Sequence, residues 1–222
     1  MSKEIERVFK FYPQNFFMEY RLDKEFYVLK IGGSLIAPKG RSGSFSAEVW
    51  LNPQNCSLNF NSKAVEQIAD EIKEAKKEKD FCLAVIHGAG CYGHWIVNDT
   101  KIHKSMKGRN KKIYLSRTQY LQDELNNKVR DIFLNKGLPA WKVDWSDILM
   151  EGGRIKNAEN KIELVCEILK KGYIPVSYGV PVFNLDSVDG YCSILSGDVI
   201  APYIARTFKA KRVLYATKCG VY

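Results

Sequence analysis

The chain has 222 residues, 45% of them hydrophobic, and a formal net charge of +9. A chain of this length buries a sizeable core, so we expect one globular domain or at most two small ones. No apolar run approaches the roughly 18 to 20 residues of a bilayer-spanning helix, and the N-terminus lacks a signal-peptide core, which predicts a soluble, cytoplasmic protein without a membrane partner. The six scattered cysteines are predicted to be buried thiols rather than a disulfide framework.

The positive charge predicts an anionic partner, and it is densest at 101–112 (KIHKSMKGRNKK), where six lysines and arginines occur without an acid. This run fits a solvated loop, a loop that overhangs an anionic ligand, or a nucleic-acid contact. No zinc-finger spacing, RNA-binding aromatic motif or helix-turn-helix pattern accompanies it. We therefore expect no nucleic-acid partner.

Strands and helices alternate along the chain. Residues 1–25, rich in aromatic and charged side chains, precede them and are predicted to form an appended helix or arm. An apolar, β-rich run at 26–31 (FYVLKI) predicts a buried strand that ends in the glycine turn GGS. An amphipathic helix is predicted within 61–80, and a second buried strand at 81–87 (FCLAVIH).

The second half continues this alternation. A long helix is predicted over 116–137, with Ser116 as a plausible N-cap and Gly137 at its end. The remaining predicted elements are a strand at 139–145, a helix at 159–172, a strand at 173–179, a β-hairpin across 180–193, a helix at 197–211 and a strand at 212–217. This order predicts an α/β fold, in which helices cover both faces of a largely parallel sheet and ligands bind at the carboxyl ends of the strands.

Two glycine-rich turns follow the first two predicted strands. The second, HGAGCYGH at 87–94, contains the G-x-G-x-x-G of dinucleotide-binding proteins, which also place an acid about 20 residues further on and use the first βα unit. Here the first acid after Asp99 is Asp123, and the turn at Gly32 and Gly33 already occupies the first unit. Both turns therefore indicate a phosphate cradle, because glycine lets backbone N–H groups approach phosphate oxygens.

Charged side chains beside these turns suit phosphoryl transfer. Lys30 lies inside an apolar strand, where an unpaired charge is costly, and Lys39 follows nine residues later; both could neutralise a transferring phosphoryl group. His94 is either a structural histidine bonded to a backbone carbonyl or a donor to a phosphate oxygen. Asp198 is either a first-turn acid of its helix or a group that holds the two lysines in register.

A metal site is not expected. The residues Cys82, His87, Cys91 and His94 have a ligand-like spacing. Cys82, however, lies about 16 Å from His87 along an extended strand, so four ligands could not reach one zinc ion.

These motifs resemble those of the amino acid kinase superfamily, and within it most closely those of the isopentenyl phosphate kinases. KIGGSLIAPK at 30–39 resembles the family's K-x-G-G-S motif with its second lysine, and HGAGCYGH resembles H-G-G-G-S-F-G-H. PVSYG at 175–179 and SGD at 196–198 resemble its third motif. The resemblance spans 26–222, and His94 is its most specific part.

The resemblance implies a role for each matched residue. The nucleotide would be bound by Lys30, Gly32, Gly33, Ser34, Gly90 and Thr217. The acceptor phosphate would lie against Ala89, His94 and Gly197. The catalytic residues would be Lys30, Lys39, which stabilises the transition state, His94, and Asp198, which organises the lysines. The resemblance also implies ATP and Mg²⁺ as cofactors, a small-molecule phosphate as substrate, a three-layer α/β/α sandwich and, usually, a homodimer.

Three departures qualify the resemblance. Ala89 replaces the family's middle glycine, and TKCGVY at 217–222 is shorter than T-D-x-D-G-[IV]-Y and lacks its acids. The family also continues past position 222 with a segment that closes over adenine. We therefore expect an N-terminal extension over 1–25 and a C-terminally truncated amino acid kinase-like domain over 26–222, with an incomplete nucleotide subdomain.

The leading hypothesis is a kinase of isopentenyl phosphate. Two alternatives stay open: a kinase of another small phosphate or phosphonate, similar to the fosfomycin kinases, and a non-catalytic member that binds phosphate.

Overall fold

The computed structural model describes residues 20–40, 45–53, 56–186 and 192–218. Most of the predicted N-terminal arm, and the turn of the predicted hairpin, lie outside these ranges. Within them, no helix is both long and apolar enough to cross a membrane.

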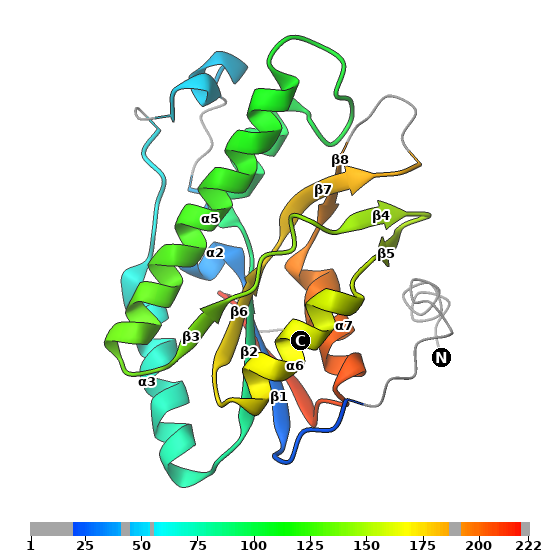
Figure 1. Cartoon of the computed structure of the whole chain (residues 1–222). Coiled ribbons are helices and arrows are strands. Elements are labelled where there is room, and N and C mark those ends of the chain that lie inside the picture. Colours follow the sequence, from blue (N-terminus) through cyan, green and yellow to red (C-terminus); the bar gives the residue numbers. More distant parts are fainter. Residues whose placement is uncertain (1–19, 41–44, 54–55, 187–191, 219–222) are drawn as a thin grey trace, which may run out of the picture.

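A parallel sheet of five strands forms the centre of the fold (Figure 1). Its order is β3 (Ala140–Lys142), β6 (Ile174–Tyr178), β2 (Cys82–His87), β1 (Phe26–Ile31) and β9 (Arg212–Ala216), and every neighbouring pair is parallel. All five strands were predicted. β1, β2 and β6 are largely buried, as expected for apolar strands covered on both faces, whereas β9 is mostly exposed.

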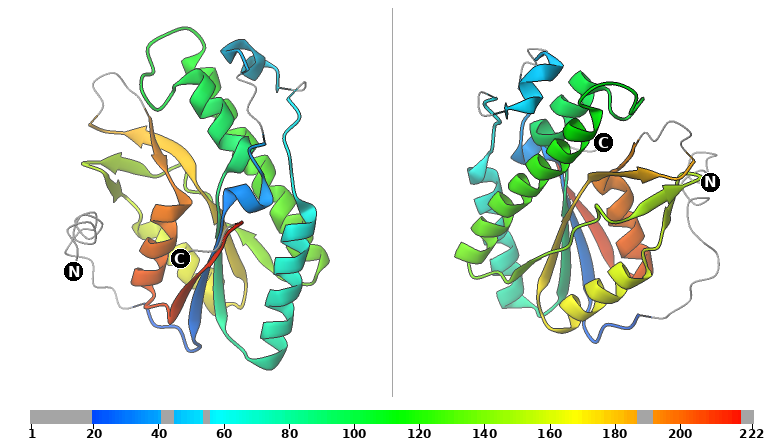
Figure 2. Two further views of the ribbon diagram at one scale, coloured as in Figure 1. Left: turned by 180° about the vertical axis from the view of Figure 1, so that it is seen from behind. Right: turned by 45° about the horizontal axis from the view of Figure 1, so that its top comes forward.

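Helices cover both faces of this sheet, so the predicted three-layer α/β/α sandwich is confirmed (Figures 1 and 2). The helices α3 (Ser62–Glu78), α4 (Gly90–Thr100) and α5 (Lys111–Asn135) bury their apolar sides against one face. The helices α6 (Glu159–Lys170) and α7 (Gly197–Thr207) pack on the other face. Two shorter elements, α2 (Gly33–Ile36) and the 3₁₀ helix η1 (Ala47–Leu51), complete the described helices.

A smaller sheet lies beyond the carboxyl ends of the central strands (Figure 1). Its order is β5 (Arg154–Lys156), β4 (Leu149–Glu151), β7 (Val180–Asn184) and β8 (Cys192–Leu195). The antiparallel pairing of β7 with β8 confirms the predicted hairpin. The β4–β5 hairpin was not predicted, because strands of three residues are too short to show a periodic pattern.

The start of α5 corrects one prediction. The helix begins at Lys111, and Ser116 lies inside it instead of capping it. Asn110 precedes the helix in the left-handed conformation (φ 69°), and its carbonyl accepts from the Tyr114 N–H at 2.9 Å. Lysines at a helix start oppose the helix dipole, so the sequence carries no start signal at 111. The basic run thus divides into a loop and the first residues of α5.

Candidate active site

The two glycine turns interlock at the carboxyl ends of β1 and β2. The Gly88 N–H donates to the Ile31 carbonyl at 2.9 Å. A Cβ atom on Gly33 would lie 2.4 Å from the nitrogen of Gly90, and one on Gly88 would lie 2.6 Å from the nitrogen of Gly33. Because real Cβ atoms essentially never approach so closely, each turn occupies the space of the other's missing side chain.

This packing leaves a row of backbone donors at the starts of α2 and α4. The first N–H groups of a helix have no acceptor within it. Those of Gly33, Ser34, Ala89 and Gly90 have no other hydrogen-bond acceptor among the described residues. An arrangement of free N–H groups around glycines is suited to phosphate oxygens.

Lys30 pairs with Asp198 across the sheet and helix layers. Strand alternation places Lys30 on the same face as Val28, the face that α7 covers. The ammonium lies 2.7 Å from the Asp198 carboxylate, and the Lys30 residue is only 8% exposed. Ser196 is the N-cap of α7 and accepts from the Asp198 N–H at 3.1 Å. Asp198 is therefore a first-turn acid and also the counter-charge of a buried lysine, whereas its role in holding both lysines in register stays a prediction.

Lys39 and His94 complete the charged groups. His94 projects from α4 and Lys39 follows α2, and both are exposed. Partial desolvation lowers the pKa of His94, the positive charge of Lys39 lowers it further, and the negative charge of Asp198 raises it. The imidazole therefore lies within the field of both groups. No ion pair joins Asp198 to Lys39 in the described part of the chain, so the structure pairs this acid with one of the two lysines.

The remaining predicted residues lie around the same edge. A Cβ on Gly197 would lie 3.2 Å from the His87 carbonyl, so α7 starts directly against the end of β2. Gly32 donates its N–H to Ala216 at 2.8 Å, and Thr217 follows at the end of β9. The structure thus brings all eleven predicted site residues to one edge of the sheet, although they come from four separate segments of sequence.

Residues that the sequence did not single out support this edge from the α5 side. The fully buried His87 ring lies 3.1 Å from Asn126 Oδ1 and stacks on Tyr178, with ring centroids 5.6 Å apart. Burial raises the pKa of Tyr178, and the carboxylates of Asp144 and Asp123 raise it further. The alternation of side chains along β2 could have predicted that His87 faces a covering helix. Its partner Asn126, 39 positions away, could not have been predicted, because that contact depends on how α5 packs on the sheet.

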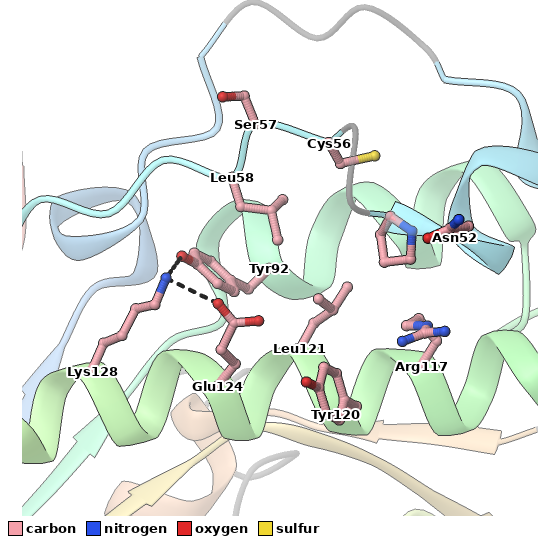
Figure 3. Close-up of a pocket in the computed structure, with 11 residues that line it drawn as sticks. Asn52, Cys56, Ser57, Leu58, Tyr92, Arg117, Tyr120, Leu121, Glu124 and Lys128 are labelled. Carbon is pink, nitrogen blue, oxygen red and sulfur yellow. Dashed lines mark hydrogen bonds and ion pairs between the residues drawn. The ribbon is translucent and has the colours of Figure 1, made fainter.

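A cavity of about 600 Å³ lies between α5 and residues 52–53 and 56–58, with Tyr92 of α4 in its lining (Figure 3). The charged side chains that line it already form hydrogen bonds or ion pairs within the protein. Lys128 donates to Tyr92 at 3.0 Å and pairs with Glu124 at 2.9 Å, and Arg117 donates to the Leu51 carbonyl at 3.2 Å. None of the predicted site residues lines this cavity.

Comparison with known proteins agrees with this geometry. The sequence model of the amino acid kinase family matches residues 25–222. The chain belongs to this family. It is 31% identical over 201 residues to an isopentenyl phosphate kinase from Methanocaldococcus jannaschii and 30% identical over 201 residues to one from Methanothermobacter thermautotrophicus. These alignments cover 86% and 88% of this chain and 68% of each relative.

A solved structure supports the same assignment. An isopentenyl phosphate kinase structure superimposes on this chain with a TM-score of 0.74 at 29% identity, covering 89% of this chain and 74% of that one. The amino acid kinase fold predicted from the motifs is therefore confirmed. Together the family and its relatives show that the chain is a phosphotransferase, a kinase that acts on a small molecule.

Proposed function

We propose that this enzyme transfers the γ-phosphoryl group of ATP to isopentenyl phosphate, giving ADP and isopentenyl diphosphate. The observation that carries the proposal is the position of His94, on the first turns of α4 beside the free N–H groups and within the field of Lys39 and Asp198. The names of the relatives support the choice of acceptor.

The residues present fit a nucleotide phosphate. The close approach of Gly33 to Gly88 and Gly90 leaves no room for a Cβ atom, and free N–H groups surround these glycines. We assign the nucleotide phosphates to Lys30, Gly32, Gly33, Ser34, Gly90 and Thr217. The described residues include no group of three or more His, Cys, Asp or Glu side chains placed to hold a metal ion. Mg²⁺ would therefore be held chiefly by the phosphates, as is usual for this ion, and would supply charge neutralisation there.

The acceptor phosphate would lie against Ala89, His94 and Gly197. His94 donates a hydrogen bond to it, and the bound anion raises the proton affinity of the imidazole. Lys39 and Lys30 flank the transferring group and neutralise the charge that develops on it. Asp198 pairs with the buried Lys30 ammonium and fixes its direction. Catalysis of this kind depends on position and charge, with no covalent intermediate on the protein.

A substrate panel tests the proposal. Turnover with ATP and Mg²⁺ is measured on isopentenyl phosphate, fosfomycin and carbamate, and we expect a clear preference for the first. Preference for either of the others would overturn the proposed acceptor. Calorimetry with ATP separates a third outcome: binding of isopentenyl phosphate without binding of ATP would identify a phosphate-binding protein that does not transfer the group.

A variant separates acceptor from nucleotide. His94→Ala should weaken acceptor binding far more than ATP binding, because the imidazole contacts only the acceptor. Equal loss of both affinities, or loss of neither, would contradict the assigned role. We also propose a cytoplasmic homodimer, by similarity to the family, and light scattering of the purified protein tests the oligomeric state.

A further inference from the structure

His87 connects three parts of the site, although its side chain does not face the substrates. It is the last residue of β2, its side chain points to the α5 face, and it is completely buried. Nδ1 lies 3.2 Å from the Gly88 carbonyl oxygen, and Nε2 lies 3.1 Å from Asn126 Oδ1. Its own carbonyl packs on Gly197 at the start of α7.

Hydrogen-bond accounting fixes the state of this ring. The Gly88 carbonyl can only accept, so Nδ1 must carry the proton. Complete burial lowers the pKa of His87, so the ring is neutral and Nε2 must accept. Asn126 therefore presents its amide NH₂ to Nε2, which requires a half-turn of the carboxamide. This orientation also gives a partner to Asn126 Nδ2, a buried donor that otherwise has none.

The bond to Gly88 has a directional consequence. A peptide group is planar, and its C=O and N–H point in opposite directions. Holding the Gly88 carbonyl on His87 therefore aims the Ala89 N–H away from the ring. Gly33 packs on the face of the same peptide group: a Cβ there would lie 2.9 Å from the carbonyl carbon of Gly88 and 3.1 Å from the nitrogen of Ala89. The peptide group between Gly88 and Ala89 is thus held by the hydrogen bond from His87 to its carbonyl and by the packing of Gly33 against its plane.

We propose that His87 is a positioning residue: through its Nδ1–H and the Gly88 carbonyl it aims the Ala89 N–H at the phosphate that is transferred or accepted. Asn126 keeps the ring in the required tautomer, and Tyr178 limits its rotation by stacking. This role rests on the proposed phosphoryl transfer, because an aimed N–H group needs an anion in front of it.

The tautomer can be measured without any assay of activity. The chain has three histidines, so nitrogen NMR of protein labelled with ¹⁵N-histidine gives three ring systems. His94→Gln and His103→Gln variants assign them. We expect His87 to carry its proton on Nδ1 and not to titrate between about pH 5 and 8. A proton on Nε2, or titration in this range, would overturn the proposal.

Two substitutions connect the tautomer to catalysis. His87→Asn keeps an N–H group near the Nδ1 position, whereas His87→Gln places its amide near Nε2 instead. Removing an oxyanion donor costs about 10²- to 10³-fold, and misdirecting one should cost less, so we expect His87→Gln to lower kcat/KM by roughly 10- to 100-fold and His87→Asn to retain more activity. Equal losses in two folded variants would contradict the proposal.

A third variant leaves His87 in place. In Asn126→Asp the carboxylate can only accept, so it should draw a proton onto Nε2 and give His87 a titration that the unmodified protein lacks. No change in the ring nitrogens would count against the Asn126 contact. If isopentenyl phosphate is not phosphorylated but the tautomer is as stated, the proposed function fails while the ring assignment stands.

Discussion

Substitution of Gly33 by alanine tests the interlocked turns most directly. The new Cβ would lie 2.4 Å from the nitrogen of Gly90, and its other near neighbours are also backbone atoms, which cannot rotate away. Ordinary contact begins near 3.4 Å, so the two turns must separate by about 1 Å. Gly33 starts α2 and is not among the glycines with positive φ, so the conformation itself suits alanine.

The expected loss follows from this displacement. A misplacement of about 1 Å in a catalytic constellation costs roughly 100-fold, which corresponds to about 2.7 kcal/mol of transition-state binding. Steady-state measurement of kcat/KM with ATP and isopentenyl phosphate gives this value. The KM values for ATP and for isopentenyl phosphate should both rise, because the turns contribute N–H donors to the phosphates of both substrates.

The neighbouring glycine supplies the control. Gly32 has an extended conformation (φ −63°, ψ 130°), and its Cβ would meet the Ala216 carbonyl at 3.3 Å, a contact that small movements relieve. Gly32→Ala should therefore melt close to the unmodified protein and lose much less activity than Gly33→Ala, although Gly32 is also assigned to the nucleotide phosphates. If Gly33→Ala is as active as Gly32→Ala, the interlocked turns do not set the site geometry.

Three further substitutions test the charged groups. Asp198→Asn should lower kcat strongly, and it should also lower stability because it removes the counter-charge of a buried lysine. Asp147→Asn removes the counter-charge of Lys161 in a pair of almost equal exposure outside the predicted site, so it should cost similar stability and leave kcat unchanged. Equal kcat values in the two variants would contradict the role of Asp198. The pKa of His94 is lowered in the free enzyme, and a bound phosphate should raise it. Binding then takes up a proton, so the KM for the acceptor should fall as the pH is lowered from about 8 to 6. If the KM of His94→Gln shows the same pH dependence, His94 is not its cause. Hydrogen bonds from Lys211, Lys79 and Tyr27 lower the pKa of Glu25 to about 2. The contribution of Glu25 to stability is therefore present above about pH 4.5 and is lost as the pH falls toward 2. Glu25→Gln should make the free energy of unfolding depend less on pH across this range with kcat unchanged, and an unaltered pH dependence would refute the assignment.

Local sequence patterns predicted most of the fold. Apolar runs located the buried strands β1, β2 and β6, and helical periodicity located α3, α6 and α7, because elements covered by a core must present apolar residues at the matching period. The strands β3 and β9 were located by their place in the alternation of strands and helices. The same patterns missed β4 and β5, whose turn at Gly152 and Gly153 relies on two positive φ angles, 55° and 71°. They also misplaced the start of α5, where packing of Tyr114 and Leu115 overrides an unfavourable charge.

The site was predicted as a set of residues but not as a geometry. A buried lysine requires a counter-charge, so the importance of Lys30 could be inferred. Asp198, an acid at a predicted helix start, was already a candidate for organising the lysines, and the family resemblance implied the same role. The separation of Asp198 from Lys39 could not be foreseen, because it depends on where α7 begins relative to α2. The contact between His87 and Asn126 likewise depends on the register of α5 against β2, which no local pattern encodes.

The pairing of Lys30 with Asp198 also makes assembly of the site a step in folding. A lysine buried in a strand opposes the folded state until a carboxylate reaches it, and that carboxylate arrives only when α7 packs on β1. The strand β1 and the last described helix, α7, should therefore open and close together. Native-state hydrogen exchange should show the amides of β1 and α7 with the same opening free energy, and separate values would contradict this. Because the proposed function assigns this counter-charge a catalytic role, we expect a molecule in which α7 has not packed on β1 to be both incompletely folded and inactive.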